Sequence, residues 1–362
     1  MPRAIRALTV LYMAVLSSTA FGQQSLKDAF SKDFLIGTAL SSRLPACYTP
    51  AELELIKAQF NCATPEWCMK PKPLQPLEGV WHFEDADAYV AFCEQNHIAA
   101  FGHTLVWHED CPDWFFLDGD KFASRELVLK RLKAHIDMVL NRYRGKIRGW
   151  DVVNEAISDN PKEYLRKTKW LETIGDDYLV QAFKIAHEAD PEMVLQYNDY
   201  NIESEPKRSK AIKLIRNLQS NGVRVAAIGI QAHWQVGRVP FADLETAINS
   251  FQNLGLKVMI TELDLDMLPR KQVANAPPPD IDLLTRHQAD DYAHLFRIFI
   301  EHRDVITRVT FWGIDDAHSW LNGWPYKREN HPLLFDREGK PKPAFDAVMS
   351  VAKQQSASTS AE

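Results

Sequence analysis

Eight short apolar runs alternate with amphipathic helical patterns along most of the chain, and this alternation constrains the fold more than any other feature. It is typical of a parallel sheet whose strands are joined by crossover helices. Most runs lack a strict apolar–polar alternation, as expected for strands that are buried on both faces. The strand candidates are Phe34–Leu40, Gln59–Thr64, Ala99–Trp107, Ile147–Asn154, Met193–Asn198, Ala226–His233, Lys257–Leu263 and Val305–Gly313.

Helical patterns fill the intervals between the runs. The candidates are Ala51–Gln59, Glu84–Gln95, Ser124–Tyr143, Tyr178–Glu188, Lys207–Gln219, Ala242–Leu254, Arg286–His302 and Lys342–Lys353. Eight strands and eight helices predict an α/β protein, a single-domain (β/α)8 TIM barrel over residues 23–353. An open doubly wound sheet is the alternative, but no Gly-x-Gly-x-x-Gly motif follows the first strand. The Pro-rich segment Ala274–Asp280 follows the seventh strand and is expected to be a loop on the active-site face.

The first residues have the features of an export signal. Arg3 and Arg6 precede an apolar stretch, and Ala20-Phe21-Gly22 forms a small-residue cleavage site, so residues 1–22 are predicted to be a signal peptide. The apolar stretch is too short to span a bilayer, which makes a membrane anchor the weaker interpretation. We therefore expect a secreted or periplasmic soluble monomer, with a flexible C-terminal tail over residues 354–362.

Charge and cysteine content exclude some partners and leave the redox state open. The formal net charge is −6 without a long basic run, which disfavours nucleic acid or an anionic membrane as a partner. The cysteine count is odd, so in an oxidising compartment at least one thiol stays free or pairs with another molecule. A local disulfide is possible, but the spacing selects no partners and matches no zinc pattern. The cysteines are Cys47, Cys62, Cys68, Cys93 and Cys111.

Polar residues gather at the C-terminal ends of seven of the predicted strands. In a barrel these ends converge on one face, where catalytic groups lie. The segments are Thr64-Pro65-Glu66, His103 to His108, Asn154-Glu155, Asn198-Asp199-Tyr200-Asn201, Gln231 to Trp234, Glu262-Leu263-Asp264, and Trp312 to Asp315.

Two of these residues, Glu155 and Glu262, suit the paired carboxylates that glycoside hydrolysis needs, one to protonate the leaving oxygen and one to attack or to activate water. Asn154 is placed to hydrogen-bond a sugar hydroxyl. Asp264 is placed to orient the imidazole of His233, which would keep Glu262 ionised. The alternative is that such groups merely tie strand ends together.

His103, His108 and His233 could in principle meet at a metal site. The sequence has no His-Glu-x-x-His helix and no clear spacing for three ligands. We therefore expect no metal and no other cofactor.

From about Ser25 to Val351 the chain resembles family 10 glycoside hydrolases, the retaining endo-β-1,4-xylanases. The order of the matching motifs is right and their coverage is nearly complete. They are Phe60-Asn61, Thr64-Pro65-Glu66, Met69-Lys70, Gly102 to His108, Trp150 to Ala156, Tyr197 to Asn201, Gln231, His233, Thr261 to Asp264, Phe311-Trp312-Gly313, Ser319-Trp320, Pro332 to Asp336 and Lys342 to Phe345.

The resemblance implies roles for individual residues. Glu155 matches the family's acid/base and Glu262 its nucleophile, while His233 and Asp264 match the hydrogen-bonding partners of the nucleophile. The other matches are substrate contacts: Asn154, His103 and Gln231 around the sugar at the cleavage point, Glu66 and Lys70 on the next sugar toward the non-reducing end, Trp107, Trp312 and Trp320 as aromatic walls, and Tyr200 on the leaving-group side.

Three departures from the family pattern fall on the glycone side of the cleft. Trp67 replaces a usual Asn, Glu109-Asp110 replaces Ser-Gln, and Ser41 replaces a common Asn. Loss of amide donors weakens the usual hydrogen bonds, so we count Trp67 and Asp110 among the expected substrate contacts and expect a re-tuned glycone site. The alternative is neutral variation with the Trp67 indole turned outward.

The sequence thus predicts hydrolysis of β-1,4 bonds in xylan or xylo-oligosaccharides with retention of configuration, with the polysaccharide as the only partner. Two alternatives stay open: a retaining barrel glycosidase for another or a decorated β-glycan, and a non-catalytic carbohydrate-binding barrel.

Overall fold

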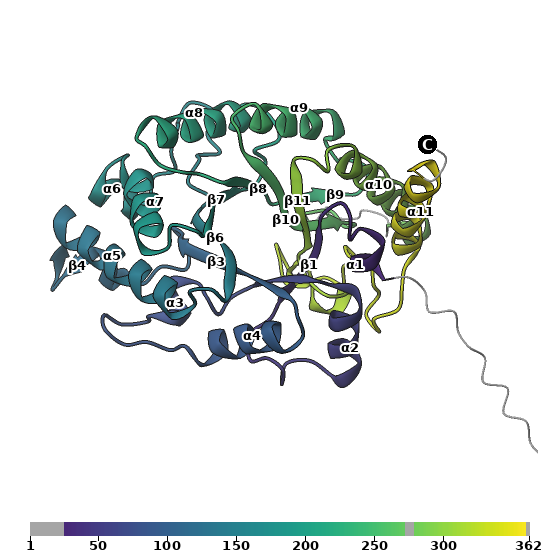
Figure 1. The fold of residues 1–362 in the computed structure, drawn as a ribbon, viewed down its shortest axis with the longest axis horizontal. Coiled ribbons are helices and arrows are strands. Elements are labelled where there is room, and N and C mark those ends of the chain that lie inside the picture. The colour runs from purple at the N-terminus through teal and green to yellow at the C-terminus, as the bar shows by residue number, and fades with distance from the viewer. Residues whose placement is uncertain (1–24, 272–278, 360–362) are drawn as a thin grey trace, which may run out of the picture.

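The computed structural model describes residues 25–271 and 279–359. Each apolar run of the sequence contains a parallel strand, and the eight strands close into a ring inside a ring of helices (Figure 1). The barrel strands are β1 (Leu35–Leu40), β2 (Cys62–Pro65), β3 (Ala99–Val106), β6 (Ile147–Asn154), β7 (Val194–Asp199), β8 (Ala227–Ile230), β10 (Lys257–Asp266) and β11 (Ile306–Phe311). Their order is β11-β1-β2-β3-β6-β7-β8-β10, and pairing of β10 with β11 closes the ring. The predicted (β/α)8 barrel is confirmed, and the open sheet is excluded.

The helices that join the strands lie outside the ring (Figure 1). Several of them begin at polar caps that satisfy free backbone N–H groups. Thr49 and Glu52 form a capping box at one helix, and Ser124 accepts from the N–H of Leu127 at another. The helices are α2 (Pro50–Gln59), α4 (Glu84–Gln95), α5 (Arg125–Arg142), α7 (Tyr178–Ala189), α8 (Lys207–Ser220), α9 (Phe241–Gln252), α10 (Ile281–Glu301) and α11 (Pro343–Thr359).

Two helices are longer than the sequence pattern predicted. Helix α10 begins at Ile281 rather than Arg286, because the carboxylate of Asp280 accepts the N–H of Leu283 and caps an earlier turn. Helix α11 continues to Thr359, so the predicted helix end at Lys353 is wrong. The helix therefore includes much of the segment 354–362 that was expected to be a flexible tail.

The predicted strand Ala226–His233 is interrupted in the structure. It forms β8 and a separate short strand, β9 (His233–Gln235), which pairs with the outer end of β10. The break occurs at Ala232, whose φ of 69° lies in the left-handed region, where a regular strand cannot continue. This break lets Gln231 and His233 both line the same cleft.

The loops contain short elements that the sequence did not predict. They are α1 (Leu26–Ala29), α3 (Pro71–Leu74), η1 (Asp113–Phe116), the hairpin β4 (Leu117–Asp118) and β5 (Lys121–Phe122), α6 (Lys169–Ile174), η2 (Asp316–His318) and η3 (Trp320–Asn322). Each is too short to show a clear periodicity in the sequence.

All five cysteines are free thiols, so the local disulfide that the sequence left open does not form here. Among the described residues, no helix combines the length and apolarity needed to cross a bilayer. The predicted signal peptide and residues 274–278 of the predicted loop lie outside the described residues.

Candidate functional site

A cleft of about 550 Å³ opens at the C-terminal ends of the barrel strands. It contains both predicted carboxylates, Glu155 and Glu262, and ten other residues that the sequence nominated. These are Glu66, Lys70, His103, Trp107, Asn154, Tyr200, Gln231, His233, Trp312 and Trp320. Asp264 lies directly behind His233, whereas Trp67 and Asp110 do not line the cleft itself.

Glu262 lies on β10 in a dense set of hydrogen bonds. Its Oε1 accepts from Nδ2 of Asn198 at 2.8 Å, and its Oε2 lies 3.1 Å from Nε2 of His233. Burial raises the pKa of this carboxyl, but the contact with His233 and the imidazole of His103 outweigh burial and hold the pKa below its usual value. Glu262 is therefore ionised at neutral pH.

His233 is held between two carboxylates. Its Nδ1 lies 3.0 Å from Oδ2 of Asp264, on the side opposite Glu262. Burial lowers the pKa of the imidazole, but Asp264 and Glu262 together raise it to about 10. Trp320 fixes the far carboxylate in turn, because its indole N–H donates to Oδ2 of Asp264 at 2.7 Å. The triad keeps a positive charge beside Glu262.

Glu155 follows β6 and has a different environment. Its Oε1 accepts from Nε2 of Gln231 at 2.9 Å, and its Oε2 accepts from the indole of Trp107 at 3.0 Å. Burial raises its pKa to about 7, and the negative charges of Asp199 and Glu262 act in the same direction. A carboxyl that holds a proton near neutrality, beside one that does not, suits acid and nucleophile roles respectively.

The backbone at Glu155 is unusual for a non-glycine residue. Its φ is 57°, in the left-handed region, and its amide donates to the carbonyl of Asn198 at 2.9 Å. Such a conformation costs on the order of 1 kcal/mol and persists where surrounding contacts enforce it. It turns the chain out of β6 just as the strand reaches the cleft.

A continuous set of amides joins the two carboxylates. The Oδ1 atom of Asn154 accepts from Gln231 at 3.3 Å and from Asn198 at 2.9 Å. These same amides donate to Glu155 and Glu262 respectively. Thr261 fixes the orientation of the Asn198 amide by donating to its Oδ1 at 2.7 Å. The network couples the positions of both acids through one asparagine.

His103, on β3, lines the cleft and is anchored from below. Its Nδ1 lies 2.8 Å from Oδ2 of Asp151, and the other oxygen of that carboxylate, Oδ1, accepts from Nε2 of Gln196. A buried carboxylate at one ring nitrogen fixes the tautomer and the plane of an imidazole.

On the glycone side, Lys70 is almost enclosed. Its Nζ lies 3.3 Å from Oδ2 of Asp110, and it faces the rings of Trp107 at 4.5 Å and Trp67 at 5.2 Å. The indole of Trp67 is 42% exposed, at the margin of the cleft. Burial raises the pKa of Glu66, which the charge of Lys70 partly offsets. Asp110 therefore acts on this side through Lys70 rather than by lining the cleft.

On the leaving-group side, Tyr200 belongs to a charged cluster. Its hydroxyl accepts from Arg166 at 2.7 Å and donates to Asp159 at 2.5 Å. Arg166 also donates to the backbone carbonyl of Glu155 at 3.1 Å. Lys207 lies 3.7 Å from the Tyr200 ring centroid, and its Nζ forms ion pairs with Asp199 at 2.9 Å and with Asp159 at 3.1 Å.

Several residues of the site were given no role from the sequence. Asn198 donates to Glu262, the nucleophile candidate. Its position at the end of a predicted strand was the only sequence feature that could have identified it as a site residue. The cleft is also lined by Glu109, Arg166, Asn201, Arg270 and Trp324. Arg166, Arg270 and Trp324 lie in long loops, where no periodicity marks them.

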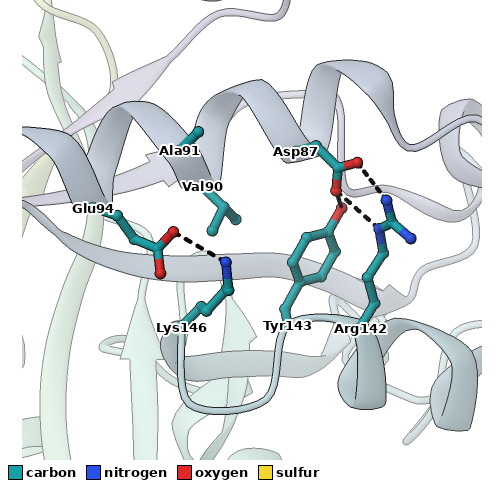
Figure 2. A pocket seen from close by; sticks show the side chains of 7 residues that line it. All are labelled: Asp87, Val90, Ala91, Glu94, Arg142, Tyr143 and Lys146. Carbon is teal, nitrogen blue, oxygen red and sulfur yellow. Dashed lines mark hydrogen bonds and ion pairs between the residues drawn. The ribbon is translucent and has the colours of Figure 1, made fainter.

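Two other groupings lie away from the cleft chemistry. The side chains of Glu52, Asp315 and His318 place possible metal-ligand atoms within 4.8 Å of one another. None of these three residues is among His103, His108 and His233, the histidines that the sequence suggested as possible ligands. A second hollow lies against α4 and the end of α5 (Figure 2). There Asp87 pairs with Arg142 and Glu94 with Lys146, so its charges neutralise one another.

A closed barrel with two carboxyls of unlike protonation at its C-terminal face defines a glycoside hydrolase. The sequence profile of glycosyl hydrolase family 10 matches residues 25–351, and the chain belongs to that family.

Similar proteins extend over almost the whole chain. An endo-1,4-beta-xylanase of Geobacillus stearothermophilus is 42% identical, covering 90% of this chain and 98% of its own. A beta-1,4-xylanase of Dictyoglomus thermophilum is 40% identical, covering 93% and 94% respectively. A crystal structure of a xylanase from Paenibacillus barcinonensis, complexed with a conduramine derivative, has a TM-score of 0.86 at 40% identity and covers 91% of this chain and 99% of its own.

Proposed function

We propose that this enzyme hydrolyses β-1,4-xylosidic bonds in xylan and xylo-oligosaccharides with retention of configuration, with Glu262 as nucleophile and Glu155 as acid/base. The observation that carries the assignment is the difference in charge state between two carboxyls in one cleft: the pKa of Glu155 is raised to about 7, and that of Glu262 is lowered. Names of relatives over most of the chain support xylan as the substrate.

In the first step, the Glu262 carboxylate attacks the anomeric carbon while Glu155 gives its proton to the leaving oxygen. The bond from the anomeric carbon to that oxygen breaks, and a glycosyl–enzyme ester forms. In the second step, Glu155 takes a proton from water, whose oxygen displaces Glu262. We expect the two carboxyls to be about 5–5.5 Å apart, as retention requires.

The other polar groups serve these steps. His233, held by Asp264, balances the charge of Glu262 before attack and during release. Asn154 and Gln231 belong to the amide network that joins the two acids, and they would contact the sugar at the cleavage point. Glu66 and Lys70 hold the next sugar on the glycone side, and Tyr200 contacts the leaving group. Trp107, Trp312 and Trp320 provide apolar walls for the sugar rings.

Kinetics of two alanine variants test the assignment. Glu262→Ala should lower kcat on xylan by roughly 10⁴-fold or more, because no covalent step remains. Glu155→Ala should lower it by about 10²–10⁴-fold on xylan but far less on aryl xylosides, whose leaving groups need no proton. Glu338→Gln, an exposed glutamate, is the control. An unchanged Glu262→Ala rate, or a first product with inverted configuration by NMR, would refute the mechanism.

A second proposal concerns the glycone side. Because Asp110 neutralises Lys70 and Trp67 flanks it, sugar binding there should differ from that of the usual amide-rich pattern. A xylo-oligosaccharide ladder should show an altered product distribution that moves toward the usual one in a Trp67→Asn, Asp110→Gln double variant. Identical ladders for the two enzymes would exclude this proposal.

A further inference from the structure

One rim of the cleft has no role in the steps above. It is formed by Trp324, which follows η3, and Arg270, which follows β10, and both line the cleft. The indole of Trp324 is 43% exposed, although large aromatic side chains are usually more buried. This rim therefore presents apolar surface to solvent beside the catalytic groups.

The rim continues the aromatic wall that starts at the catalytic triad. The ring of Trp320 lies 5.0 Å from that of His233, and Trp324 stacks on Trp320 at 4.9 Å with an interplanar angle of 28°. The wall thus runs outward from the side chain that contacts Glu262. A sugar ring bound near the cleavage point would have Trp324 within reach of its substituents.

The loop that carries Trp324 is fastened to the segment that carries Arg270. Arg328 donates through Nη1 to the carbonyls of Leu268 at 3.0 Å and Pro269 at 2.8 Å. The hydroxyl of Tyr326 donates to the same Pro269 carbonyl at 2.8 Å. Binding to a surface held in this way needs little reorganisation.

The rim also carries a net positive charge, because two arginines pair with a single aspartate. Arg270 and Arg328 share one carboxylate: Oδ2 of Asp266 lies 3.2 Å from Nε of Arg270 and 2.7 Å from Nη2 of Arg328. Within residues 25–271 and 279–359, neither guanidinium has a second acidic partner. By contrast, the cleft cation Lys70 pairs with Asp110, whose only ion pair among the described residues is with Lys70.

The geometry of Arg270 directs this surplus charge toward the cleft. Its Nη2 donates to the backbone carbonyl of His233 at 3.1 Å, and the guanidinium lies 5.4 Å from the ring centroid of Trp324. Its side chain is 37% exposed, so a ligand can reach it. An exposed indole beside an under-neutralised guanidinium matches a sugar that carries a carboxylate.

We propose that Trp324 and Arg270 form a subsite for a uronic acid branch of the polysaccharide. The apolar face of the branch sugar packs on the indole, and its carboxylate accepts hydrogen bonds from the guanidinium, whose planar fork fits carboxylates. This subsite rests on the proposed xylan hydrolysis, because the branch is carried by the chain in the cleft. It adds a preference for acidic decoration.

Two matched branched xylo-oligosaccharides test the proposal, one with a uronic acid branch and one with that carboxyl reduced to an alcohol. The readout is the ratio of kcat/KM on the acidic substrate to that on the reduced substrate, which cancels general damage to the active site. Arg270→Gln should lower this ratio by about tenfold, as expected for loss of one charge-assisted contact. Trp324→Ala should lower kcat/KM on both branched substrates more than on a linear one.

Arg303→Gln is the matched control, because it removes the same charge beside Asp33, away from the cleft. An Arg270→Gln ratio equal to that of the unmodified enzyme would overturn the proposal, even if every individual rate fell. If the enzyme cleaves no linear xylo-oligosaccharide, the proposed function fails instead. Calorimetric binding of the two branched compounds to the unmodified enzyme and Arg270→Gln then tests the subsite by itself.

Discussion

At the scale of single residues, two chemically identical side chains acquire opposite properties from their neighbours. Glu262 has a cationic imidazole at 3.1 Å, whereas Glu155 has only neutral donors, Gln231 and Trp107, and a nearby negative charge from Asp199. The sequence predicted the two acids, but the division of charge depends on contacts between different strands. That division sets the dependence of activity and stability on pH.

Trp107→Phe should move the alkaline limb of the pH profile of kcat/KM to higher pH. The indole N–H stabilises the ionised form of Glu155, so its loss raises the pKa of that carboxyl further, and the protonated acid persists to higher pH. Trp234→Phe is the matched control, because its indole donates to Glu203 instead. A limb that moved to lower pH, or that moved equally in both variants, would contradict this account.

Glu155→Gln should stabilise the fold at alkaline pH. The pKa of Glu155 is about 7 in the folded chain against an ordinary value of 4.5, so its stability contribution is complete below about 4.5 and is lost as pH rises through 7. A neutral amide escapes this loss, which amounts to about 3 kcal/mol. The free energy of unfolding of both proteins, measured at pH 4.5 and 8, gives the test. An equal difference at both pH values would count against a raised pKa.

At the scale of elements, the sequence pattern located every barrel strand and every large helix, because their periodicity extends over many residues. Where the pattern misplaced the boundary of an element, one local feature of the structure set the true boundary. The carboxylate of Asp280 extended α10 backward, and the left-handed Ala232 divided one predicted strand into β8 and β9. Neither event changes the hydrophobic pattern from which elements are recognised.

Gly102→Ala should severely destabilise the barrel. Gly102 pairs with Trp150 across β3 and β6, and an added Cβ would lie 2.3 Å from the indole. Overpacking at a buried strand pair should cost more than about 3 kcal/mol. Thermal unfolding is the measurement, with Gly323→Ala as control, because an added Cβ there meets no atom closer than 3.7 Å. A melting temperature like that of the control would show that the strands can separate without cost.

At the scale of the whole molecule, closure of the ring brings residues from seven barrel strands or their ends around one cleft. β1 pairs with β11 although the first and last strands of the barrel are distant in sequence, and in the closed ring Glu262 shares a cleft with Glu155. The export of this molecule, inferred from residues 1–22, is a proposal, and so is its monomeric state.

When the full-length chain is expressed in a bacterium that exports it, the processed protein should begin at Gln23. The small residues Ala20 and Gly22 fit the cleavage site of a signal peptide. N-terminal sequencing of the periplasmic or secreted protein is the measurement, and Gly22→Glu should block processing. An intact chain that starts at Met1 and sediments with membranes would favour the anchor interpretation instead.

The sequence by itself determined the number and order of the strands, the cluster of polar residues at their C-terminal ends, and the two acids to compare. These follow from periodicity and from residue type, which are properties of neighbours along the chain. Only the tertiary structure decided which contacts set the charge states of the two carboxyls, how Asn154 joins the two acids, that Asp110 pairs with Lys70, and that Arg270 and Arg328 share Asp266. The reason is physical: charge state and hydrogen bonding depend on groups within a few ångströms, and closing the barrel chooses those groups from remote parts of the chain.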